Sequence, residues 1–167
     1  MSGDQDFVEL ATARGPALFR TAWLLTGDWH LAEDLVQETL GRVYARWSRV
    51  AAADDPAAYV HTVLVNVFHS HRRRRSSTER PTDVSELTEA ARSDADISLK
   101  VALRDALGRL DRLDRAVVVL RYWDDLDAPA TGVLVGLSPA AVRTRCSRAL
   151  TRLRQVLGDD LADLLAR

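Results

Sequence analysis

Histidines are the side chains of this sequence that most directly suggest a metal site. His69 and His71 stand two apart in "FHSHRRRR", and at 100° per residue a helix would point their side chains about 200° from one another. His61 and His69 lie two turns apart, roughly 12 Å along a helix that rises 1.5 Å per residue. Neither pair can chelate one ion, so we predict no metal site and no cofactor.

The carboxylates of "AEDLVQETL" and the single cysteine offer acid–base or nucleophilic chemistry. Neither Glu33 nor Glu38 has a histidine three residues later, and no second copy of the motif supports a di-metal helical bundle. Cys146 falls on the apolar side of a predicted helix, where it packs as a small hydrophobe. Glycines do not take the spacing of a phosphate-binding loop. We therefore predict that the protein is not an enzyme, with a bundle enzyme built on Glu33, Asp34, Glu38 and the histidines as an alternative.

Arginines gather at two places in a chain whose formal net charge is only −1. Residues 72–75 are four consecutive arginines, and five arginines without an acid lie between Leu137 and Leu157. The second cluster lies on one helix, whose arginines can meet phosphates. The first cluster is either a basic tail or the end of an element that holds nucleic acid. A nuclear address for the first cluster and an ordinary solvated surface for the second are the plainer alternatives.

Helices must position these residues, because no stretch alternates apolar and polar residues long enough to form a strand. We expect an all-α protein with two small helical domains, residues 1–75 and residues 97–167. Between them, residues 76–96 carry six acids against two arginines and few large apolar side chains. Such a composition cannot bury enough surface to fold, so we predict a flexible acidic linker and leave open how the domains pack.

Two polar stripes mark the first domain. Asp34, Gln37 and Glu38 share one side of a helix, opposite its apolar arc, and this acidic side should repel DNA. It is either a surface for a protein partner or an ordinary solvated face. The next helix begins at an aspartate followed by Pro56. Its polar side leads into the arginine run in steps of four, three and four, through Thr62, Asn66, His69 and Arg73.

The second domain has the pattern of a helix-turn-helix. A short helix, a turn containing Gly136, and a longer basic helix with Ser138 as N-cap and Pro139 at its first position follow one another. The longer helix would place small and hydrogen-bonding side chains outward, with arginines beside them to meet phosphates. The outward and flanking residues are Arg143, Thr144, Arg145, Ser147, Arg148 and Arg152.

The chain carries no sign of export. It has one cysteine, which excludes an internal disulfide framework, and its N-terminal "MSGDQDFVEL" lacks the basic and apolar regions of a signal peptide. Its longest apolar runs fall far short of the roughly 20 residues that span a bilayer. We therefore expect a cytoplasmic protein without membrane insertion.

Taken together, these stretches resemble a bacterial extracytoplasmic-function (ECF, group IV) sigma factor of the sigma-70 family, in its SigE-like branch. The resemblance covers nearly the whole chain, through "AEDLVQETLGRVYARW", "DPAAYVHTVLVN", "LRDALGRLDRLDRAVVVLRYWDDL" and "GLSPAAVRTRCSRALTRLR". It implies sigma regions 2 and 4, and an alternative sigma factor that binds core RNA polymerase, recognises minus-35 and minus-10 promoter elements and promotes melting. Promoter DNA, core polymerase and an anti-sigma factor are the partners that it suggests.

The resemblance also assigns residues to these partners. It implies that the polymerase clamp helices bind Asp34, Leu35, Gln37 and Glu38. It implies that the minus-10 strand meets Asn66 and the arginines Arg72, Arg73, Arg74 and Arg75, to which the polar stripe adds Thr62 and His69. It implies that the minus-35 element is read by Arg143, Thr144, Ser147 and Arg148, to which the flanking positions add Arg145 and Arg152.

The chain departs from the family pattern at two places in the second domain. Ala130 and Gly132 stand where the family usually has an acid and an alanine, and Ala140-Ala141-Val142 replaces the usual Gly-Thr-Val. The loss of the acid removes a polar contact near DNA, so the minus-35 sequence is not predicted. The remaining alternative is a helix-turn-helix regulator that works without polymerase.

Overall fold

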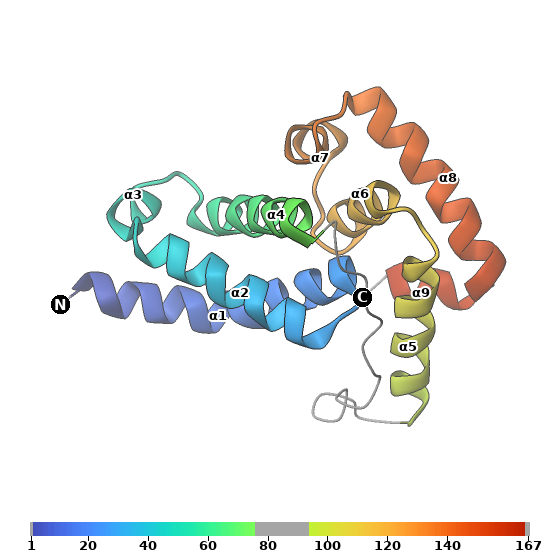
Figure 1. The fold of residues 1–167 in the computed structure, drawn as a ribbon, viewed down its shortest axis with the longest axis horizontal. Helices are drawn as coiled ribbons and strands as arrows, with labels where there is room; N and C mark the ends of the chain where they lie inside the picture. Colours follow the sequence, from blue (N-terminus) through green and yellow to red (C-terminus); the bar gives the residue numbers. More distant parts are fainter. Residues whose placement is uncertain (1, 76–93, 166–167) are drawn as a thin grey trace. The chain divides into compact units, whose positions relative to one another are not determined.

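The computed structural model describes the backbone of residues 2–75 and 94–165 (Figure 1). Every regular element in these two ranges is an α-helix, and the helices form two compact units, one on each side of residues 76–93. The predicted all-α fold with two helical domains is therefore confirmed. Most of the predicted linker, residues 76–93, lies outside the described residues, whereas residues 94–96 belong to a helix instead.

The first unit contains α1 (Ser2–Thr26), α2 (Trp29–Tyr44), α3 (Trp47–Ala51) and α4 (Pro56–Arg75). The three long helices α1, α2 and α4 lie side by side in alternating directions, and the short α3 packs across them (Figure 1). Their apolar stripes meet in a buried core. Several of its members are 0% exposed, among them Leu35, Val43, Val60, Leu64 and Val67. This packing leaves the opposite sides of α2 and α4 polar and accessible.

Capping residues explain where the helices of the first unit begin. The Asp28 carboxylate accepts a hydrogen bond from the Leu31 backbone N–H at the start of α2. The Asp55 carboxylate accepts one from the Ala58 N–H at 3.0 Å, and Pro56 occupies the first position of α4. The predicted start of α4 is thereby confirmed, and its cap sets the register of the polar side that follows.

The second unit contains α5 (Asp94–Gly108), α6 (Arg112–Tyr122), α7 (Ala128–Val135), α8 (Pro139–Leu157) and α9 (Asp160–Leu165). Helix α6 packs against both α7 and α8, while α5 and α9 also lie against α8. The buried stripe of α8 is formed by Val142, Cys146, Ala149, Leu150, Leu153 and Leu157. Cys146 therefore lies on the apolar side, as predicted, and burial raises the pKa of its thiol.

A tight turn joins α7 to α8, as the sequence predicts. Gly136 takes φ +72°, a left-handed conformation that glycine adopts without strain, and the Ser138 hydroxyl accepts from the Ala141 N–H at the start of α8. The Leu137 N–H donates to the Gly132 carbonyl at 2.9 Å. A Cβ placed on Gly132 would lie 2.4 Å from the Leu137 carbonyl oxygen, so the turn has room only for glycine.

Candidate functional site

The polar side of α2 holds the residues expected to contact a protein partner. Asp34 and Gln37 are exposed, and Glu38 is half-buried. Leu35 differs from its prediction as a contact residue, because its side chain is 0% exposed within the core of the first unit. Leu35 packs with the other apolar residues of α2 and holds the helix in the core. It is therefore not one of the residues that a protein partner would contact.

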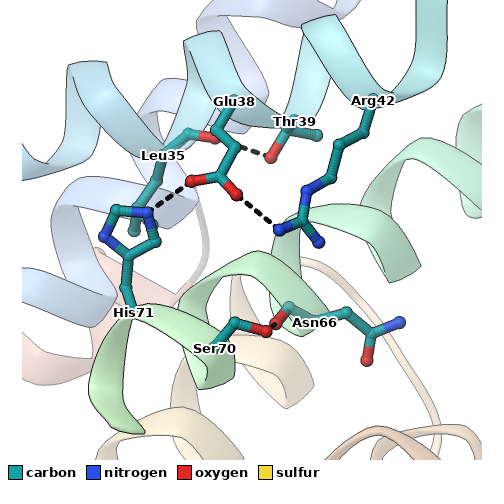
Figure 2. A network of polar contacts seen from close by, with 7 residues as sticks. All are labelled: Leu35, Glu38, Thr39, Arg42, Asn66, Ser70 and His71. Carbon is teal, nitrogen blue, oxygen red and sulfur yellow. Dashed lines mark hydrogen bonds and ion pairs between the residues drawn. The ribbon is translucent and has the colours of Figure 1, made fainter. Parts of the chain in front are cut away.

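Glu38 is held between two basic side chains (Figure 2). One carboxylate oxygen lies 2.5 Å from Nε2 of His71, on α4, and the other lies 2.5 Å from a guanidinium nitrogen of Arg42, one turn along α2. These contacts lower the pKa of the Glu38 carboxyl, the hydrogen bond with His71 having the largest effect. The contact between Glu38 and His71 connects the polar side of α2 to the end of α4, where the arginine run begins.

The exposed side of α4 carries the residues expected to meet a DNA strand. Thr62 and Asn66 are exposed, and His69 is half-buried. The Thr62 hydroxyl donates to the Ala58 carbonyl, and the Asn66 carbonyl accepts from the Ser70 hydroxyl. In Figure 2 the side-chain amide of Asn66 points away from the Glu38 cluster. The backbone of Arg72, Arg73, Arg74 and Arg75 continues α4, but their side chains lie outside the described part of the structure.

Helix α8 presents four of the predicted minus-35 residues on its accessible side. Arg143, Thr144, Ser147 and Arg148 are all exposed, and they lie opposite the buried stripe of the helix. The Thr144 hydroxyl donates to the Ala140 carbonyl at 3.1 Å, one turn earlier, which fixes its rotamer. The four side chains thus form one accessible patch at the N-terminal half of α8.

Arg145 and Arg152 are turned toward the second unit's own acids. A guanidinium nitrogen of Arg145 lies 2.7 Å from one carboxylate oxygen of Asp114, on α6, and Arg152 lies 3.6 Å from the other. Asp114 is only 6% exposed. Asp111, the N-cap of α6, lies 3.7 Å from Arg145; its pKa is lowered, first by the hydrogen bond from the Asp114 backbone N–H. Helical spacing placed Arg145 and Arg152 beside the outward residues, and in the structure both contact Asp114 of their own unit.

Among the residues that the structure describes, no three or more histidine, cysteine, aspartate or glutamate side chains are grouped so that they could hold a metal ion. In the same ranges, no helix combines the length and apolar character that crossing a membrane requires.

Sequence comparison matches both units to described protein regions. Residues 10–78 match the model of sigma-70 region 2, and residues 100–153 match that of sigma-70, region 4. The RNA polymerase sigma-E factor of Streptomyces coelicolor is 35% identical over 155 residues, which cover 91% of this chain and 86% of that protein. The ECF RNA polymerase sigma factor SigL of Mycobacterium tuberculosis is 32% identical over 145 residues, or 84% of this chain and 82% of that protein.

The fold has a counterpart among solved structures. The sigma factor RpoE of Bartonella quintana, crystallised with the anti-sigma factor NepR, superimposes with a TM-score of 0.76 at 24% identity, over 93% of this chain and 99% of that one. Two sigma-70 regions in the expected order, with relatives more than 30% identical over most of their length, show that the chain belongs to the extracytoplasmic-function sigma factors of the sigma-70 family, which are alternative sigma factors for transcription initiation.

Proposed function

We propose that this sigma factor directs core RNA polymerase to its promoters through three separate surfaces. The polymerase face comprises Asp34, Gln37 and Glu38 on α2. The strand face comprises Thr62 and Asn66 on α4, together with the four arginines that end the helix. The recognition face comprises Arg143, Thr144, Ser147 and Arg148 on α8. One observation carries this assignment: on all three helices, residues that match the family's motifs are exposed, whereas the motif residue Leu35 is buried. The exposed ones are Asp34, Gln37, Asn66, Arg143, Thr144, Ser147 and Arg148.

The polymerase face is suited to a protein and not to DNA. Asp34 and Glu38 bring negative charge to it, and Gln37 adds an amide that can donate and accept. Negative side chains repel the phosphate backbone, so they would orient this side of α2 away from the promoter and toward basic residues of the polymerase. Leu35 contributes by holding α2 in its core.

The strand face is suited to one melted DNA strand. Binding an extruded base needs hydrogen-bonding groups for its edge and positive charge for the adjacent phosphates. Asn66 supplies an exposed amide, and the arginine run supplies charge directly after it in the sequence. Capture of a base there would stabilise the open minus-10 element, and the enzyme activity would remain that of the polymerase.

The recognition face is suited to the major groove of duplex DNA. Arg148 and Arg143 can each form bidentate pairs with guanine or contact phosphates, while Thr144 and Ser147 are short enough to allow close approach. Each DNA-binding face would make few phosphate contacts, which give only a modest affinity at physiological salt. Attached together to core polymerase, they would act through effective concentration, which makes promoter binding dependent on the polymerase.

Run-off transcription with purified core RNA polymerase tests this proposal. We expect a specific transcript from the wild-type chain, and Arg148→Ala should weaken promoter binding by roughly 10-fold to 100-fold if it loses a bidentate base contact. Arg109→Ala, which removes an exposed arginine outside α8, is the matched control and should change little. Tight site-specific DNA binding without polymerase, combined with no transcript from any cognate core, would contradict the proposal.

The setting of this activity follows from the same proposal. Because it would work on core polymerase and promoter DNA, we place the protein in the cytoplasm as a non-enzymatic subunit. Solved structural relatives are complexes of RpoE with the anti-sigma factor NepR and of CnrH with the cytosolic domain of CnrY, which supports an anti-sigma partner here as well.

A further inference from the structure

One buried acid in the second unit binds two arginines of the proposed recognition helix. Asp114 lies in the first turn of α6, and its carboxylate receives Arg145 at 2.7 Å and Arg152 at 3.6 Å. These arginines are seven residues apart, which is two turns, so they leave α8 on the same side. Asp114 therefore spans two turns of α8 from a single position on α6.

The exposure of the three side chains is unequal. The Asp114 side chain is 8% exposed, whereas those of Arg145 and Arg152 are 38% and 59% exposed. The acid is thus confined within the unit, but the arginines lie at its edge, where long side chains can turn to solvent. If the acid lost its charge, Arg152 would lose its contact with a carboxylate and Arg145 would keep only the longer one with Asp111, at 3.7 Å. Both guanidinium groups could then turn to a phosphate instead.

Free arginines on a recognition helix affect specificity. Contacts with phosphates add affinity for every DNA sequence alike, while contacts with base edges distinguish one sequence from another. Helix α8 has five arginines, and the Asp114 contacts leave Arg143, Arg148 and Arg154 to meet DNA. Fewer phosphate contacts mean that base reading decides a larger share of the binding free energy.

We propose that Asp114 is a specificity-determining positioning residue, which withholds Arg145 and Arg152 from the DNA backbone and sets the rotation of α8 against α6. The inference rests on the proposed function of α8 as the reader of the minus-35 element. Asp114 acts through the two arginines and does not itself touch DNA.

The test uses the full chain bound to core RNA polymerase and an Asp114→Asn variant, which keeps the shape of the side chain and removes its charge. Binding to a cognate promoter and to one with a scrambled minus-35 element is measured over a range of KCl concentrations. We expect the variant to distinguish the two promoters less well than the wild type. The slope of log Kobs against log salt should become steeper by about 0.9 for each arginine that gains a phosphate.

Two further variants distinguish a role of Asp114 in positioning the arginines from a role in the stability of the second unit. Asp105→Asn removes an exposed acid of α5 that pairs with the adjacent Arg104, so it makes the same charge change and should leave slope and discrimination unchanged. Adding Arg145→Gln to Asp114→Asn should bring the slope back toward the wild-type value. Equal weakening of binding to both promoters, with no change in slope, would mean that Asp114 is only a structural residue and would overturn the inference.

The single variant Arg145→Gln keeps the inference testable even if Asp114→Asn does not fold. Because Arg145 is withheld from DNA, its loss should leave the salt slope at the wild-type value. A slope less steep by about 0.9 would show that Arg145 already contacts a phosphate, and would refute the inference. A wild-type chain that does not distinguish the two promoters would instead contradict the proposed function of α8.

Discussion

In each unit, one acidic side chain connects a helix that is proposed to bind DNA to a neighbouring helix. We call each of these polar contacts between helices a tie, and the two ties differ in their basic partner and in their burial. In the first unit, Glu38 is 28% exposed and contacts His71 on α4. In the second, Asp114 is 8% exposed and contacts Arg145 on α8. A contact that is more exposed is weakened more by competing water and by salt. The contact of Asp114 with Arg145 is therefore the more persistent of the two, because its acid is the more deeply buried.

The difference indicates what each helix has to do. A recognition helix that reads duplex DNA works best when its rotation is fixed before binding, because ordering it on the DNA would cost affinity. The end of α4 is proposed to bind a strand that appears only as the promoter melts. The partly exposed contact between Glu38 and His71 holds that end more loosely, since polar contacts near the surface contribute on the order of 1 kcal/mol or less.

The largest expected effect comes from a pair of helical glycines, one in each unit. Gly132→Ala should destabilise the second unit by about 1–3 kcal/mol, because the new Cβ would lie 2.4 Å from the Leu137 carbonyl oxygen and force the turn to move. Gly41→Ala should stabilise the first unit by about 0.5–1 kcal/mol, because a Cβ on this exposed position of α2 has no neighbour within 4 Å. Amide hydrogen exchange, followed separately in each unit, measures both changes.

The two glycine variants control for one another, since they make the same chemical change within a helix. If both variants altered the free energy of unfolding by the same amount and sign, the tight turn between α7 and α8 would not be the cause.

Gly132→Ala should also reduce discrimination of the minus-35 element, because the turn sets the orientation of α8.

Local patterns in the sequence predicted most of the fold. Helix starts at Pro56 and Pro139 follow from the cap before each of them, and the apolar side of α8 follows from helical periodicity. Such features depend on residues within a few positions of each other. Gly132 was also visible as a departure from the family's usual alanine, but only the backbone of the turn supplies the reason for it.

Contacts between distant residues could not be predicted in this way. Glu38 and His71 are 33 positions apart, and Asp114 and Arg145 are 31 apart. Their pairing depends on how α2 meets α4 and how α6 meets α8, which periodicity does not specify. The contact of Glu38 with Arg42, by contrast, joins residues four positions apart on the same helix, a spacing that the sequence shows directly.

A second, smaller contrast comes from removing the two acids. Asp114→Ala should destabilise the second unit by about 1–3 kcal/mol, because Arg145 loses its charged partner and the buried site loses side-chain contacts. Glu38→Ala should cost the first unit about 0.5 kcal/mol, since both of its contacts are partly exposed. Hydrogen exchange at increasing urea concentrations measures the free energy of unfolding of each unit separately, and so compares the two losses. Equal losses would mean that burial does not distinguish the two ties.

The smallest expected effect is the pH dependence of the tie in the first unit. The contacts with His71, and then with Arg42, lower the pKa of the Glu38 carboxyl below its ordinary value of 4.5. A carboxyl whose pKa is lower in the folded state stabilises the fold fully above its unfolded pKa, and this contribution is lost as the pH falls through the folded pKa. The stability difference between wild type and Glu38→Gln should therefore be constant above about pH 5 and should shrink below pH 4.5.

Urea unfolding of both chains between pH 3.5 and pH 7 measures this difference, which should not exceed about 0.5 kcal/mol because the pair is partly exposed to solvent. NMR titration of the Glu38 carboxyl carbon measures its cause more directly, and its midpoint should lie below 4.5 in the wild type. In His71→Gln the midpoint should rise, but not fully, because Arg42 still contacts the carboxylate. An unchanged midpoint in that variant would show that Arg42 alone lowers the pKa, and that α4 is not tied to α2 through Glu38.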